Sequence, residues 1–281
     1  QSSKAIIFNA HVDTVPVGDK KLWKSDPFAA KEISGKIYGL GASDDKGAIA
    51  DLLFLAGNFL KKKPACDVWL TFVVTEEVDG SGTAELMTCF MKKQAKYYLD
   101  IAGVIGEPTN LSKIEIAHKG NVFLKVTTEG NSGHASRPMS PGKHAVENMF
   151  SISLKLKTLA KKWEKEYSDK LLGFPTFGNL TSITAGSVAS PNKFPDTCTA
   201  TFDIRTIPSM HDKVVKLVKA VIGKEADIGL VYPPVGCGYT NPNNAIVTIF
   251  QKVSGARVGA FSMGSCDLPF FSSFGIPAVI F

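Results

Sequence analysis

The sequence contains 281 residues, of which 44% are hydrophobic and 21% charged, and its formal net charge is +6. This balance is typical of a globular protein and excludes a collagen-like rod, a disordered chain and a disulfide framework. Apolar runs stay short of the roughly 18 residues that a membrane-spanning helix needs. The lysine-rich stretches lack interleaved aromatic residues, which favours solvated helix faces. We therefore expect neither a membrane nor a nucleic acid as partner, and the five scattered cysteines favour the reducing cytoplasm.

The N-terminal part of the chain alternates short apolar runs with amphipathic stretches. Ala5–Phe8, Val68–Val74 and Ile101–Ile105 are continuously apolar, which predicts strands covered on both faces, as in a parallel sheet. Helices are predicted between these strands, over Lys46–Lys63 and Thr83–Lys96. The alternation predicts an α/β layer architecture. The first helix is expected to have its apolar residues on one side, namely Ile49, Leu52, Leu53, Ala56 and Leu60.

The middle of the chain has a different order of elements. Lys113–Glu129 is expected to form two strands, broken at Lys119–Asn121. After a long helix, two further strands are predicted around Leu180–Val188 and Thr197–Arg205, and a helix over Asp212–Ile222. This β-β-α-β-β-α order predicts a small antiparallel sheet with helices on one face. The long helix is marked by the core-facing stripe Ala145, Met149, Ile152, Leu156 and Leu159.

The α/β character returns after Pro233 and Pro234, with a helix near Ala245–Val253 and a final apolar strand that ends at Phe281. We therefore predict an α/β catalytic domain with a mostly parallel sheet and helices on both faces, formed by residues 1–114 and 235–281. Residues 115–234 are expected to form an inserted α+β domain of the ferredoxin-like type, which would serve as a lid or dimerisation domain.

Each of the three N-terminal strands is followed at once by residue types that bind metal ions. The carboxyl ends of parallel strands lie at one edge of a sheet, so these side chains are expected to converge there. Asp44, just before the first predicted helix, can face the same edge. An acidic residue at the end of a single strand is common. It is the gathering of several such residues at one edge of the sheet that favours a metal site. The other residues are His11 and Asp13 after the first strand, Glu76 and Glu77 after the second, and Glu107 after the third.

One imidazole with several carboxylates suits Zn²⁺, with Mn²⁺ or Co²⁺ as substitutes. The carboxylates outnumber what one catalytic ion needs, which favours two ions that share a bridging carboxylate. The adjacent pair Glu76 and Glu77 is informative, because one of them can ligate while the other stays free as a base.

Several longer motifs resemble the di-zinc amidohydrolases, the family of succinyl-diaminopimelate desuccinylase, acetylornithine deacetylase, aminoacylase and glutamate carboxypeptidase. They occur in the family's order between His11 and Phe281. The motifs are H-V-D-T-V-P, W-K-S-D-P-F, G-K-I-Y-G-L-G-A-S-D-D-K-G, T-E-E, G-E-P-T and G-H-A-S-R-P.

The resemblance implies a role for each matching residue. His11 and Glu107 correspond to ligands of one zinc ion, Asp44 to the bridging carboxylate and Glu77 to a ligand of the other ion. Asp45 occupies the variable position of the family's D-x-K-G motif, so it corresponds to a neighbour of the ligands and not to a ligand. The remaining correspondences are Glu76 to the general base, Asp13 to the acid that orients the imidazole, His134 to the histidine that stabilises the oxyanion, Arg205 and Asn192 to contacts of the substrate carboxylate, and Gly264 to the pocket-lining segment that runs to Asp267.

The resemblance also implies hydrolysis of the amide bond of an N-acyl amino acid by a water molecule activated by two Zn²⁺ ions, in a homodimer formed through the inserted domain. A dipeptidase or a carboxypeptidase-type exopeptidase of the same family is the alternative. A catalytically inactive relative that serves as a binding or dimerisation module is a third reading, which the intact ligand set disfavours. The family's last zinc ligand, a histidine, is expected beyond Phe281, and its first helix and strand before Gln1, so this chain is expected to be a fragment.

Overall fold

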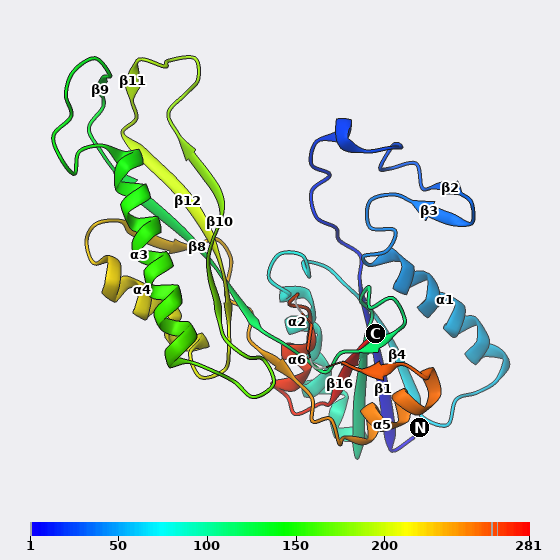
Figure 1. Cartoon of the computed structure of the whole chain (residues 1–281). Helices are drawn as coiled ribbons and strands as arrows, with labels where there is room; N and C mark the ends of the chain where they lie inside the picture. The colour runs from blue at the N-terminus through cyan, green and yellow to red at the C-terminus, as the bar shows by residue number, and fades with distance from the viewer. Residues whose placement is uncertain (1, 260, 263) are drawn as a thin grey trace. The chain divides into compact units, whose positions relative to one another are not determined.

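The computed structural model describes residues 2–259, 261–262 and 264–281. Figure 1 shows its helices and strands, which form two compact units. One unit consists of Gln1–His118 and Gly238–Phe281, and the other of Lys119–Cys237. Within the described residues, no helix combines the length and the apolar character that crossing a membrane requires.

A four-stranded parallel sheet forms the centre of the first unit. Its inner strands are β1 (Lys4–His11) and β5 (Asp100–Ile105). Its outer strands are β4 (Asp67–Val73) beside β1 and β16 (Ala278–Ile280) beside β5. Because all four strands run in the same direction, the residues that follow β1, β4 and β5 leave the sheet at the same edge.

Helices cover both faces of this sheet, because successive strand side chains point to opposite sides. On one face, Ile7 of β1 packs in a core with α2 (Ser81–Lys93) and α6 (Leu268–Ser272). On the other face, Val104 of β5 packs in a core with α5 (Ala245–Ser254). The predicted fold class, a parallel α/β domain with an inserted α+β domain, is confirmed.

The first helix, α1 (Lys46–Lys61), is less buried than its sequence pattern predicts. Leu52 is buried, but Leu53 and Leu60 of the expected apolar side are exposed, Leu60 by 91%. The helix packs on the sheet chiefly through β1, so only the side that faces this strand is covered. The apolar side of this helix is therefore covered only in part.

The second unit is an antiparallel sheet with two helices in the element order β-α-β-β-α-β and the strand order β10-β12-β8-β13, which is ferredoxin-like. All five residues of the predicted core-facing stripe of α3 are buried, which confirms that stripe. The elements of this unit are β8 (Gly120–Glu129), α3 (Ala145–Glu166), β10 (Thr176–Ala185), β12 (Thr197–Thr206), α4 (Val214–Ile222) and β13 (Asp227–Leu230).

The predicted β-β-α-β-β-α order of the middle segment was wrong at both ends. The residues before Lys119 belong to the first unit, where β6 (Lys113–Ile114) and β7 (Ala117–His118) pair with β15 (Arg257–Val258) and β14 (Gly238–Tyr239). At the other end, β13 is short and contains a glycine, so its sequence carries little strand signal. The remaining small elements are β2 (Lys31–Ile33), β3 (Lys36–Tyr38), β9 (Gly133–His134), β11 (Lys193–Phe194), η1 (Lys20–Leu22), η2 (Ala95–Tyr97) and η3 (His211–Lys213).

Candidate metal centre

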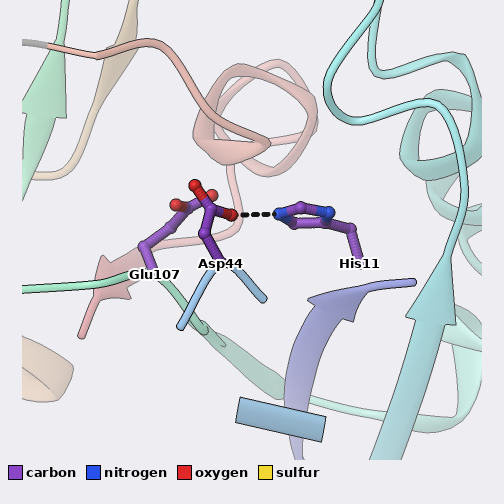
Figure 2. A group of neighbouring side chains, drawn as sticks. All are labelled: His11, Asp44 and Glu107. Atoms are coloured by element: carbon purple, nitrogen blue, oxygen red, sulfur yellow. Dashed lines mark hydrogen bonds and ion pairs between the residues drawn. The ribbon is translucent and has the colours of Figure 1, made fainter. Parts of the chain in front are cut away.

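Three of the predicted ligands meet at the carboxyl edge of the parallel sheet. His11 is the last residue of β1, Glu107 follows β5, and Asp44 precedes α1. Each offers one ligand atom, and these atoms lie within 4.8 Å of one another. Figure 2 shows the three side chains side by side. Gly106 permits this approach, because a Cβ atom there would lie 2.5 Å from the Cβ of Ala48 in α1.

The imidazole of His11 is fixed from both sides. Its Nε2 lies 2.8 Å from Oδ1 of Asp44 (Figure 2), and the side chain is 2% exposed. Its Nδ1 lies 3.1 Å from the backbone carbonyl oxygen of Asp13 and 3.5 Å from the carboxylate of the same residue. Because the oxygens of Asp13 and Asp44 all accept hydrogen bonds, both ring nitrogens carry a hydrogen in the metal-free chain, and a bound cation would take the place of the hydrogen on Nε2.

The turn after β4 brings two further acids to this edge. Thr75 adopts φ 64°, a strained left-handed conformation for a β-branched residue. The two carboxylate oxygens of Asp13 accept the backbone N–H groups of Glu76 at 3.3 Å and Glu77 at 3.2 Å. Oε2 of Glu76 then lies 3.9 Å from Nε2 of His11. Asp13 thus contacts both the imidazole and the backbone of the Glu76–Glu77 pair.

The acids of this edge repel one another. Burial and the charge of Asp267 raise the pKa of Glu76 to about 8. Burial and the charge of Glu76 raise the pKa of Glu107, and burial with the charge of Asp44 raises that of Glu77. Burial lowers the pKa of His11, but the hydrogen bond to Asp44 and the charges of the surrounding acids raise it to about 9.

A bound divalent cation would fit this edge, because it would supply the positive charge that the carboxylates lack. Two buried carboxylate oxygens close to the cluster, Oδ1 of Asp45 and Oδ1 of Asp267, have no hydrogen-bond partner among the described residues. The donors are one imidazole nitrogen and carboxylate oxygens, a set that suits Zn²⁺, Mn²⁺ or Co²⁺.

Two buried residues of this region have contacts that the sequence did not reveal. Asp45 is the residue before α1, yet its Oδ2 accepts the backbone N–H of His11 at 3.0 Å. Asp267 precedes α6 and accepts hydrogen bonds from Asn9 and Thr83. Only the position of Asn9 among apolar strand residues could have signalled this second group, since a buried amide needs polar partners.

The predicted oxyanion residue His134 and the predicted substrate contacts Asn192 and Arg205 belong to the second unit. Nδ1 of His134 lies 2.7 Å from the hydroxyl of Ser136, and its Nε2 lies 3.3 Å from Nδ2 of Asn192. Arg205 donates to Asp203 at 2.9 Å. Gly264 lies in the first unit, in an exposed bend before α6.

The parallel sheet, the acid and imidazole cluster at its edge and the inserted ferredoxin-like unit define an α/β protein with a candidate metal centre. The chain belongs to peptidase family M20/M25/M40, because the sequence model of this family matches residues 7–281. The predicted family membership is thereby confirmed.

Curated relatives and solved structures of this family resemble the chain. An acetylornithine deacetylase from Buchnera aphidicola is 33% identical over 215 residues, covering 76% of this chain and 53% of the relative. A succinyl-diaminopimelate desuccinylase from Coxiella burnetii is 33% identical over 215 residues, covering 73% and 54%. The chain thus spans about half the length of these relatives.

Among solved structures, a metallo-carboxypeptidase from Sulfolobus solfataricus aligns with a TM-score of 0.73 and 22% identity, covering 99% of this chain and 77% of that one. The dipeptidase Dug1p from Saccharomyces cerevisiae aligns with a TM-score of 0.75 and 17% identity, covering 99% and 72%. These two structures share the fold of this chain.

Proposed function

We propose that the protein is a metal-dependent hydrolase that cleaves the amide bond of an N-acyl amino acid. The observation that carries this proposal is the group of His11, Asp44 and Glu107, whose ligand atoms lie within 4.8 Å of one another. The deacetylase and desuccinylase relatives favour an acyl amino acid as the substrate class.

The proposed ligands of one cation are His11, Glu107 and Asp44. Asp44, the proposed bridging carboxylate, would also hold the second cation, together with Glu77. Two Zn²⁺ ions are proposed, with Co²⁺ or Mn²⁺ as substitutes, because the donor set combines imidazole nitrogen with carboxylate oxygen. When bound, the cations lower the pKa of water and polarise the scissile carbonyl.

Glu76 is the proposed general base. Its side chain is 10% exposed, and its Oε2 lies 3.9 Å from Nε2 of His11, so it borders the cluster. The carboxylate takes a proton from the attacking water and gives it to the departing amine. Asp13 is the proposed positioning acid, which its contacts with His11 and with the backbone of Glu76 and Glu77 support.

The proposed substrate contacts follow from the family motifs. His134 would stabilise the oxyanion, Asn192 and Arg205 would bind the substrate carboxylate, and Gly264 would line the pocket. The 3.3 Å approach of His134 and Asn192 supports a shared role for these two residues.

A homodimer through the second unit and a cytoplasmic location complete the proposal. In support of the dimer, β10 is an outer strand of its sheet and exposes Leu180 and Ile183. In support of the location, all five cysteines are free thiols.

A dipeptidase or carboxypeptidase-type activity is the second candidate, because solved structures with these activities share the fold. The decisive experiment compares the release of free amine from N-acetyl amino acids, N-succinyl amino acids and dipeptides by the Zn²⁺-loaded protein. Preferred hydrolysis of the acyl amino acids supports the first candidate, and preferred hydrolysis of the dipeptides supports the second. Zn²⁺ binding by the full-length protein without hydrolysis of any of them would favour an inactive binding relative.

A further inference from the structure

Asp267 is a buried acid with no place in the proposed ligand set. It precedes α6 and is 2% exposed. Its Oδ2 accepts hydrogen bonds from Oγ1 of Thr83 at 2.6 Å and from Nδ2 of Asn9 at 2.8 Å. Both donors are neutral, and within the described chain its Oδ1 is buried without a partner. A buried carboxylate with only two neutral hydrogen-bond donors destabilises the folded chain, unless a nearby positive charge offsets its negative charge.

Asn9 connects this carboxylate to the backbone that carries two proposed ligands. It lies two residues before His11 in β1 and is 1% exposed. Its side-chain oxygen accepts the hydroxyl of Thr71 in β4 at 2.7 Å. Its backbone oxygen accepts the N–H of Gly106, the neighbour of Glu107, at 2.8 Å. Asp267 is therefore one hydrogen bond away from β1 and, through Asn9, two hydrogen bonds away from Gly106, which directly follows β5.

The charge of Asp267 also acts on the acids of the metal centre. After burial, it is the largest of the causes that raise the pKa of Glu76 to about 8. Burial raises the pKa of Asp267 itself to about 6, and the bonds from Thr83 and Asn9 and the positive charge of His11 oppose this shift. Above neutral pH the side chain is thus an anion in the field of the centre.

We propose that Asp267 is a positioning residue of the metal centre: its buried negative charge is compensated by the bound cations, and its hydrogen bonds hold the end of β1 that carries His11. This inference rests on the proposed metal site. The negative charge destabilises the metal-free protein and strengthens the binding of cations. Its removal therefore has opposite effects on the two states, which the loss of a merely structural contact would not have.

The test is Asp267→Asn, which keeps the shape of the side chain and removes its charge. Zn²⁺ affinity is measured at pH 8 in competition with a chromophoric chelator, and thermal unfolding is measured on the metal-free protein. We expect Zn²⁺ affinity to fall about 10- to 100-fold. We expect the metal-free unfolding temperature to rise by about 2–4 °C.

Asp100→Asn is the matched control. It removes the same charge from an exposed residue that pairs with Lys4 at the opposite ends of β1 and β5. This control should leave the Zn²⁺ affinity unchanged. The inference is overturned if Asp267→Asn binds Zn²⁺ like the wild type, if its affinity loss equals that of the control, or if the metal-free variant is destabilised or unfolded. A wild-type chain that binds no Zn²⁺ would instead refute the metal centre, and the inference with it.

Discussion

Replacement of Glu76 by glutamine tests whether this residue acts as the general base or as a cation ligand. The amide keeps the size of the side chain, and the backbone N–H that Asp13 accepts at 3.3 Å is untouched. Glu76 is 10% exposed at the border of the cluster, so the variant should fold and bind cations. The lost proton transfer should lower kcat about 10²- to 10⁴-fold. This equals about 3–5 kcal/mol of barrier, at 1.36 kcal/mol for each tenfold change.

The assay follows the free amine released from an N-acyl amino acid by Zn²⁺-loaded protein, with the bound zinc quantified in the same sample. Glu85→Gln is the control, because Glu85 is an exposed acid of α2 in the same unit and should leave kcat unchanged. A kcat of Glu76→Gln within tenfold of the wild type would refute the assignment as base. Loss of zinc from this variant would show that Glu76 is a ligand.

Three further outcomes follow from the structure. Folding raises the pKa of Asp45 from 3.8 to about 7, that of Glu76 from 4.5 to about 8 and that of His11 from 6.5 to about 9, so the folded metal-free chain holds more protons than the unfolded chain. Its unfolding temperature should therefore decrease as the pH rises from about 5 to about 9. An increase over this range would contradict the electrostatics. Asp13→Ala should weaken Zn²⁺ binding about 10- to 100-fold in calorimetric titration, whereas unchanged affinity would exclude a positioning role. Leu156→Ala, in the core of the second unit, should cost about 2–5 kcal/mol in denaturant unfolding without changing Zn²⁺ affinity; the exposed Leu154→Ala is its control, and equal effects would contradict the packing.

The sequence predicts the strands of the first unit well because these strands are covered on both faces. Ile7 belongs to one core and its neighbour Phe8 packs against the other, which requires continuous hydrophobicity. The periodicity of α3 is informative for a related reason, since its buried positions form one stripe. The same reasoning fails for Leu60 in α1, because hydrophobic spacing does not tell how much of a helix the sheet covers.

The metal centre was predictable in part. The position of residues after parallel strands is a topological rule, so the approach of His11 and Glu107 follows from strand order alone. The bond from Asn9 to Asp267 spans 258 residues and depends on where α6 packs, which no local pattern encodes. Likewise, Asp13 contacts the backbone of Glu76 and Glu77, and backbone partners leave no trace in side-chain motifs.

Titration of the metal-free protein with Co²⁺ tests the centre most directly, because the visible absorption of Co²⁺ reports its ligands. We expect saturable binding, with absorption bands that change in His11→Ala, since this variant removes the only proposed nitrogen ligand. Absence of binding by the wild type, or identical spectra and affinities for both proteins, would contradict a cation site formed by His11, Asp44 and Glu107.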